Sequence, residues 1–327
     1  MKKWYFILII NLVIFSDCNQ DRLPDENRQV KNTNIKELEG TLRISGAYAL
    51  DPLVTRWAEE FKKTHPKTVF EIRKAGTGRG LEDLISGEIE LAMVSREFSD
   101  EEEEIGFWKI GVAKDGVVAI TNAANPYLTN ILSEGMTIAD FTDIFTSEKG
   151  QQWGDILKIK NDDSIIVFTR SDISGAADLW ARFLWKEQKD LRGKEVEGDE
   201  NMIQAILDQP LGLGFCNSVF AYNKTTRKEI SGIKVVPIDH NSNGIIEKNE
   251  RFYDSLDLIQ RAMWLGKYPC HLFRTLYFVS KEKPLNDLET EFLKWVLTDG
   301  QEQVGIEGYV KLRNSEIKMN LKMLNEE

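Results

Sequence analysis

The amino-acid sequence predicts a doubly wound α/β fold with two lobes. Strand-like and helix-like segments alternate from residue 41 onward, an arrangement typical of parallel sheets covered by helices. Two glycine-containing turns, at 76–80 and 170–176, each lie between an apolar strand-like run and a helix-like run. The chain of 327 residues is also long enough for two substantial cores.

The first α/β unit is expected as a β-α-β-α-β series. Its segments, in chain order, are a strand over 41–45, a helix capped by Asp51 and started by Pro52, a strand over 69–72, a helix from Leu81 to a stop at Gly87, and a strand over 90–94. The acidic run 101–104 is interpreted as the start of a solvated helix.

The second unit repeats the alternation. Its expected segments are a strand over 117–121, a helix that starts at Thr137 with Asp140 in a capping box, a strand over 165–168 with the helix after it, a late strand over 276–279, and a C-terminal amphipathic helix around Phe292. A strand over 233–238 and a helix from Phe252 flank a polar loop.

The two glycine turns predict anion binding. The first N–H groups of a helix have no partner inside it and lie at the positive end of its dipole, so they can hold an oxyanion. Arg170 adds a guanidinium to the second turn, and Thr77 and Ser174 add hydroxyl donors. An alternative for Arg170 is a structural ion pair.

The N-terminus predicts export. Lys2 and Lys3 precede an apolar run over 4–15, which has the layout of a secretory signal. Cys18 then follows in a sequence that resembles a lipoprotein cleavage box, although Asp17 departs from the small residue favoured before the cysteine. We expect a signal peptide over 1–18, lipidation of Cys18, and a polar tether over 19–37 that holds the protein at a bacterial membrane, in the periplasm or at the cell surface.

The formal net charge is −11, with 42 basic and 53 acidic residues. This balance argues against nucleic-acid binding, which needs a basic surface, but it is compatible with a small anion held by local donors. Cys216 and Cys270 would be able to pair in an exported protein, but Cys216 lies in an apolar run and is equally consistent with a buried thiol, so we favour no disulfide.

Taken in order, the short motifs of this chain resemble the phosphate-binding subunits of phosphate ABC importers, in the periplasmic binding protein type II superfamily. The similarity covers nearly the whole chain beyond the tether. The motifs that carry it are Gly46-Ala47-Tyr48, Asp51-Pro52-Leu53, Gly76-Thr77-Gly78-Arg79-Gly80, Ala92-Met93-Val94-Ser95-Arg96, Asp115-Gly116, Arg170 with Ser174-Gly175, and Tyr277-Phe278-Val279.

The resemblance implies two lobes joined by two crossing strands that close on a dehydrated oxyanion, most simply phosphate, without catalysis. Lobe 1 would comprise 38–117 and 275–327, and lobe 2 would comprise 118–274. An ABC transporter permease would be the partner. The ligand-binding residues carried over by position are Ala47, Tyr48, Thr77, Ser95, Arg96, Arg170, Ser174, Gly175 and Ala176.

Several positions depart from the family pattern. Ala47, Tyr48 and Ala176 stand where hydroxyl residues are usual, and Ser95 stands where some members place a carboxylate that accepts the proton of hydrogen phosphate. Arg96 is interpreted either as a ligand contact or as a structural ion pair. Sulfate, arsenate and molybdate therefore remain open as ligands beside phosphate.

Two other classes of function are alternatives. An anion sensor or surface scaffold of the same fold would suit the missing hydroxyls at Ala47 and Ala176. An enzyme such as a phosphatase is less favoured, because the sequence offers no nucleophile–base pair.

Residues 239–250 match the twelve-residue calcium-loop pattern. We expect a structural calcium site there, with a polar turn as the alternative. Gly244 would permit the sharp turn. The expected ligands are Asp239, Asn241, Asn243, the carbonyl of Ile245, Glu247 and Glu250.

Overall fold

The computed structural model of the protein describes residues 38–284 and 286–326. The expected signal peptide, Cys18 and the tether lie outside these residues. The strands form one connected sheet in the order β2-β1-β3-β9-β4-β7-β5-β6, and β8 pairs with β4. Their bounds are β1 (Gly40–Gly46), β2 (Thr68–Lys74), β3 (Leu91–Val94), β4 (Trp108–Asn122), β5 (Ile166–Arg170), β6 (Lys194–Val196), β7 (Gly212–Asn217), β8 (Ile233–Val235) and β9 (Phe273–Ser280).

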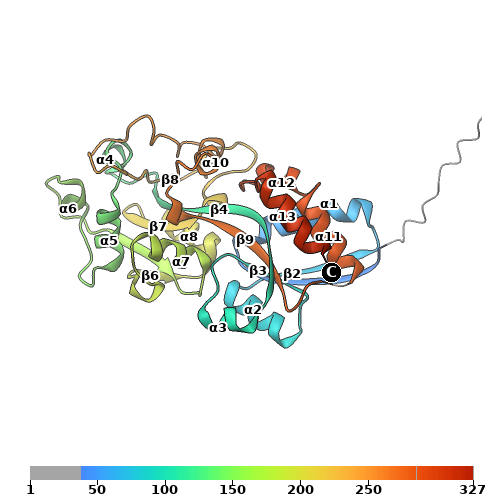
Figure 1. The fold of residues 1–327 in the computed structure, drawn as a ribbon. Coiled ribbons are helices and arrows are strands. Elements are labelled where there is room, and N and C mark those ends of the chain that lie inside the picture. The colour runs from blue at the N-terminus through green and yellow to red at the C-terminus, as the bar shows by residue number, and fades with distance from the viewer. Residues whose placement is uncertain (1–37, 285, 327) are drawn as a thin grey trace, which may run out of the picture. The chain divides into compact units, whose positions relative to one another are not determined.

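Helices flank the sheet and connect most of its strands (Figure 1). In the first half of the chain they are α1 (Asp51–Thr64), α2 (Thr77–Ser86), α3 (Asp100–Ile105), α4 (Leu128–Glu134), α5 (Ile138–Thr146) and α6 (Trp153–Leu157). In the second half they are α7 (Gly175–Phe183), η1 (Gln188–Asp190), α8 (Gly198–Leu207), α9 (Ser218–Ala221), α10 (Leu256–Trp264), η2 (Cys270–Leu272), α11 (Asp287–Leu297), α12 (Gln301–Ile306) and α13 (Asn314–Asn325).

Strands β4 and β9 connect the two halves of the sheet. They pair antiparallel from Trp108 with Ser280 to Gly116 with Phe273, while the far end of β4 pairs with β7 and β8. Figure 1 shows the two strands running side by side between the halves. The sheet therefore passes through the two crossing strands that the family resemblance implies.

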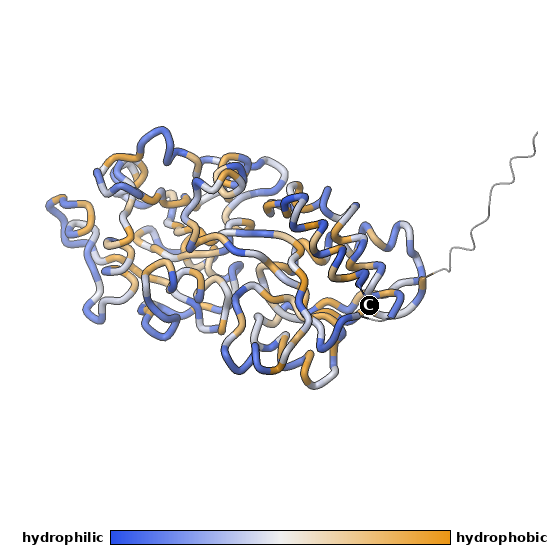
Figure 2. The backbone as a smooth tube through the Cα atoms, in the orientation of Figure 1, coloured by the Kyte–Doolittle hydropathy of each residue, from blue (hydrophilic) through white to orange (hydrophobic). Residues whose placement is uncertain are grey.

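The apolar residues form two large cores, one in each half. One core contains residues from Leu42 to Ala113 and from Leu276 to Leu324, and the other contains residues from Val117 to Leu272 together with Val310. Figure 2 shows the alternation of hydrophobic and hydrophilic positions around the C-terminal helices that cover the first core. Along β4 the residues of one core end at Ala113 and those of the other begin at Val117. We keep the names lobe 1 and lobe 2 for the segments defined above.

Most predicted elements are present, and the differences lie at their ends. The capping box of Thr137 with Asp140 and the stop of α2 at Gly87 are confirmed. Asp51 is the first residue of α1 and Leu50 is its N-cap, so the predicted cap is wrong by one residue. Helix α2 begins at Thr77 rather than at Leu81, so the glycine turn is itself the first helical turn.

Two other boundaries, those of α10 and β4, also differ from the prediction. Helix α10 begins at Leu256 rather than at Phe252, because the hydroxyl of Ser255 caps it by accepting the N–H of Leu258. Strand β4 starts at Trp108, so it is far longer than the predicted segment 117–121. The first half was not predicted because Lys109, Lys114 and Asp115 interrupt the apolar pattern that indicates a buried strand.

The two lobes touch directly in this structure. The hydroxyl of Tyr48 in lobe 1 donates to Glu197 Oε1 in lobe 2 at 3.0 Å, and Lys74 Nζ lies 3.1 Å from Glu200 Oε1. Gly175 of lobe 2 also packs against Ser95 of lobe 1. These contacts describe a closed arrangement of the lobes.

Removal of the anion should open the lobes, because hinge closure around a ligand is the usual response of proteins with this architecture. We therefore expect solution scattering to give a larger radius of gyration for protein refolded without anion than for the same protein saturated with phosphate. Identical curves, with binding confirmed by calorimetry, would show that the lobes do not move.

Candidate functional site

Two helix N-termini define the first candidate site. Helix α2 has Gly76 as its N-cap, with φ at 82° and no side-chain cap, so its first N–H groups remain open to a ligand. Helix α7 has Ser174 as its N-cap, and the Ser174 hydroxyl oxygen accepts the N–H of Ala177 at 3.1 Å. That hydroxyl keeps its own proton as a donor. Both ends have the geometry that favours oxyanions.

The two helix starts meet at Ser95, the residue after β3. A Cβ added at Gly175 would lie 2.2 Å from the Ser95 carbonyl oxygen and 2.4 Å from Ser95 Oγ, so only glycine permits this approach. The Ser95 N–H donates to Thr77 Oγ1 at 3.2 Å, and the two hydroxyl oxygens are 3.4 Å apart. Thus the structure brings the predicted residues Thr77, Ser95, Ser174 and Gly175 together, and all of them are buried.

Arg170 lies at the end of β5, beside the start of α7. Its Nε and Nη2 each donate to an Asp172 carboxylate oxygen at 2.8 Å, and its Nη1 lies 3.2 Å from Asp199 Oδ2. Nη1 is buried and makes no well-aligned hydrogen bond. Burial alone would lower the pKa of Arg170, but the carboxylates of Asp199 and Asp172 outweigh it and raise the pKa, so the guanidinium stays charged.

Tyr48 covers the guanidinium of Arg170. The centre of its ring lies 5.6 Å from Arg170 Cζ, within the range of a cation–π contact. Burial, and then the hydrogen bond to Glu197, raises the pKa of Tyr48 to about 12. The phenol therefore remains protonated and can keep its bond between the lobes. Its role in this structure is to shield Arg170 from solvent.

The remaining predicted contacts have other partners or positions. The N–H of Ala47 donates to the carbonyl oxygen of Met93 at 2.9 Å, so this amide is already used. Arg96 donates from Nη1 and Nη2 to the two carboxylate oxygens of Glu102, at 2.6 and 2.7 Å, which favours its structural interpretation. Ala176 is the second residue of α7 and is buried.

Sequence reasoning missed a set of buried polar residues behind the helix starts. Arg274 on β9 donates from Nε to Asp115 Oδ1 at 2.8 Å and from Nη2 to Asp115 Oδ2 at 3.2 Å, and Nη2 also donates to Asn217 Oδ1. Asn217 donates to Asp199 from its backbone N–H and its Nδ2, both at 2.8 Å. A continuous polar network therefore links Arg274 to Arg170. The signal available in the sequence was a charged residue inside each of two apolar strands, the negative Asp115 in β4 and the positive Arg274 in β9.

The predicted calcium loop, residues 239–250, is a second candidate site in lobe 2. Asp239 and Glu250 are each only 2% exposed. Gly244 N–H donates to Asp239 Oδ2 at 2.8 Å, and the N–H groups of His240 and Glu247 donate to the two oxygens of Glu250 at 3.0 Å. Neither carboxylate forms an ion pair with any described residue, which leaves two buried negative charges without a cation.

Other features of the loop bear on metal binding. Ile246, at the eighth position, is buried and donates its N–H to the Ser133 carbonyl oxygen at 2.9 Å, which fixes the loop to the end of α4. Asn241 Nδ2 donates to Glu247 Oε2 at 3.1 Å. Across the residues that the structure describes, no three His, Cys, Asp or Glu side chains are grouped as metal ligands. Asp239, Glu247 and Glu250 therefore do not form such a group in this structure, and amide and carbonyl oxygens would have to contribute to a site.

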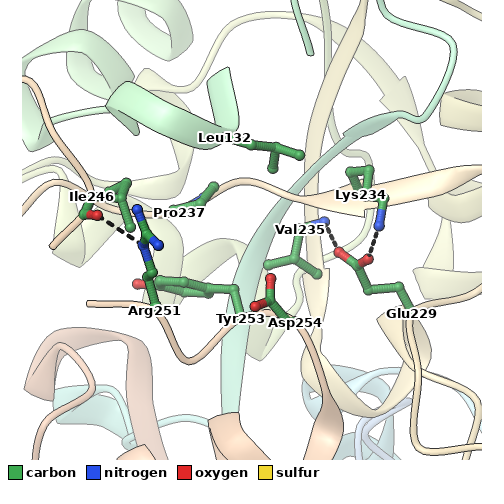
Figure 3. A pocket seen from close by; sticks show the side chains of 9 residues that line it. All are labelled: Leu132, Glu229, Lys234, Val235, Pro237, Ile246, Arg251, Tyr253 and Asp254. Carbon is green, nitrogen blue, oxygen red and sulfur yellow. Dashed lines mark hydrogen bonds and ion pairs between the residues drawn. The ribbon is translucent and has the colours of Figure 1, made fainter. Parts of the chain in front are cut away.

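A pocket of about 220 Å³ lies beside this loop, between α4 and the segment after it (Figure 3). Ile246 and Arg251 line one side, and Glu229, which accepts from Lys234 and from the N–H of Val235, lines the other. None of the lining residues belongs to the site at α2 and α7. Glu229 and Lys234 pair with each other, and Arg251 donates from Nε to the Ile246 carbonyl oxygen at 3.1 Å. We assign the pocket no ligand.

Comparison with known proteins identifies the family. A family profile described as the PBP superfamily domain matches residues 32–300. The chain belongs to this family. Over the described residues, no helix combines the length and the apolar character needed to span a bilayer.

Named relatives have similar lengths. The chain is 26% identical over 298 residues to the phosphate-binding protein PstS of Staphylococcus haemolyticus, covering 88% of this chain and 86% of that protein. It is 27% identical over 301 residues to PstS of Pseudomonas aeruginosa, covering 84% of each chain.

Solved structures show the same two-lobed fold. A putative phosphate ABC transporter substrate-binding protein from Clostridium perfringens, solved with bound phosphate, superposes with a TM-score of 0.69 at 23% identity, covering 84% of this chain and 100% of that one. An ABC-type phosphate transport receptor from Vibrio cholerae superposes with a TM-score of 0.60 at 18% identity, covering 83% and 100%.

Proposed function

We propose that this protein is a solute-binding protein that captures an oxyanion, phosphate in the first place, between its lobes and delivers it to an ABC importer. The observation that carries the proposal is the charged, buried Arg170 at the end of β5, beside the start of α7. Its Nη1 lies 3.2 Å from Asp199 Oδ2 but has no aligned hydrogen-bond acceptor. The names of the PstS relatives and the solved phosphate transport receptors support phosphate as the ligand. The proposal assigns the protein no reaction.

The N-terminal sequence supports the location. A basic and then apolar segment followed by Cys18 would export the chain and anchor it by lipid, and residues 19–37 would tether the lobes beside a permease. Radiolabelled palmitate should appear in the protein made by cells and not in a Cys18→Ala variant. Labelling of both proteins would exclude Cys18 as the lipidated residue.

The function is tested by calorimetry with phosphate, sulfate, arsenate and molybdate on protein refolded without anion. We expect phosphate to bind and Arg170→Ala to weaken that binding by about thirtyfold or more, because truncating one partner of a buried charged hydrogen bond costs about 2–5 kcal/mol. Arg182→Ala is the matched control, since Arg182 is an exposed arginine of the same lobe that pairs with Asp178.

Thermal melting of each variant would show that it is folded. A change of less than about threefold for folded Arg170→Ala would remove Arg170 from the site. Tighter binding of sulfate or molybdate than of phosphate would identify that anion, and not phosphate, as the transported ligand. Binding without any effect of the protein on phosphate uptake by cells would favour an anion sensor, and turnover of a phosphate ester would favour an enzyme.

We also propose that the loop 239–250 binds calcium in a structural role. The supporting observation is the burial of Asp239 and Glu250 without a cation among the described residues, since buried charges need a partner. Asp239, Asn241, Asn243, the carbonyl of Ile245, Glu247 and Glu250 would supply the oxygen ligands that calcium prefers. The ion would fasten the loop to α4 through Ile246.

Chelation of calcium should lower the melting temperature by several degrees. A ligand present at about a hundredfold excess over its Kd stabilises the folded state by about 2.7 kcal/mol. Glu250→Gln should remove most of the difference between calcium and chelator, whereas Glu148→Gln, at an exposed position of the same lobe, should keep it. A melting curve that responds to neither chelator nor Glu250→Gln would identify the loop as a polar turn.

A further inference from the structure

Arg274 occupies a special place in the fold, because it lies on a crossing strand and not in either lobe's binding turn. It stands opposite Asp115 in the register of β4 and β9. The carboxylate of Asp115 accepts hydrogen bonds from Nε and Nη2 of Arg274, and the side-chain amide oxygen of Asn217 accepts another from Nη2. One whole nitrogen of the guanidinium, Nη1, remains.

That nitrogen is buried and has no hydrogen-bond partner. Only 6% of the Arg274 side chain is exposed, so water is largely excluded from it. A charged donor in this position is costly unless an acceptor reaches it. In the part of the chain that the structure describes, no protein acceptor does so.

Arg274 Nη1 is directed at the start of α7. A Cβ on Gly175 would lie 2.5 Å from Arg274 Nη1 and 2.4 Å from Ser95 Oγ, which places both polar atoms at the point where the two lobes meet. Arg170 Nη1, on the other side of the shared network, is the second buried guanidinium nitrogen without an aligned acceptor. Arg170 Nη1 lies 3.2 Å from Asp199 Oδ2, whereas Arg274 Nη1 has no carboxylate of the described residues beside it, so Arg274 is the side chain that most clearly lacks a buried acceptor.

We propose that Arg274 donates from Nη1 directly to the bound oxyanion, so that a crossing strand holds the ligand together with the two lobes. The inference rests on the proposed function and extends it from the binding turns to the hinge. Asp115 and Asn217 would fix the plane of the guanidinium, leaving Nη1 free for the ligand. A ligand held in this way would pull on β9 as the lobes close.

A charge-balanced double variant provides the test, because it separates ligand contact from the structural ion pair. In Arg274→Gln/Asp115→Asn the buried pair is replaced by two neutral amides, so no unpaired charge is left behind. We expect this variant to melt near the wild-type temperature and to bind phosphate about thirtyfold or more weakly in calorimetry. Asp115→Asn alone leaves the buried charge of Arg274 without its carboxylate, so we expect it to melt at a lower temperature than the double variant.

Lys114→Gln is the matched control, since Lys114 is the neighbouring cation on β4 and pairs with Glu316 at 2.6 Å. A folded double variant that binds phosphate within about threefold of the wild type would overturn the proposal. If the double variant does not fold, Arg274→Lys replaces it, because lysine keeps the charge but lacks the planar fork. Phosphate binding weakened about thirtyfold or more would support the proposal, and binding within about threefold of the wild type would overturn it. Wild-type protein that binds none of phosphate, sulfate, arsenate and molybdate would instead overturn the proposed function, and this inference with it.

Discussion

The buried ion pair of Arg274 with Asp115 joins the two strands that connect the lobes, and the binding residues are arranged around it. It fixes β9 against β4 where the apolar core of one lobe gives way to that of the other. Asn217 and Asp199 extend it to Arg170 beside α7. Loss of one charge of this pair would therefore disturb the hinge and the binding turn together.

The charges behind the site explain how an acidic protein can hold an anion. Asp115, Asp172 and Asp199 outnumber the two arginines that they contact. Asp115 and Asp172 bind the Nε and Nη2 side of Arg274 and Arg170, and Asp199 lies 3.2 Å from Arg170 Nη1. Their effect is to orient Arg170 and Arg274 and to keep them charged. The remaining N–H groups and the starts of α2 and α7 then present donors, and short-range donors determine anion binding more than the formal charge of −11 does.

The sequence predicted the parts of the site that are local in the chain. Thr77, Ser174 and Arg170 belong to short turns whose glycine and hydroxyl residues indicate helix starts, and the structure brings these turns together. Asp115 belongs to a quoted motif, but its pairing with Arg274 was missed because 159 positions separate the two residues and neither lies in a turn motif. Local patterns also do not show that the amide of Ala47 is used by Met93 or that Arg96 pairs with Glu102.

A crystal structure grown with phosphate tests the central claim most directly. The account predicts a tetrahedral anion between the starts of α2 and α7, with oxygens about 3 Å from Arg170 Nη1 and from the hydroxyls of Thr77 and Ser174. Two results would contradict it: phosphate found elsewhere on the protein, or closed lobes in which Arg170 Nη1 and Arg274 Nη1 are bonded only to protein atoms.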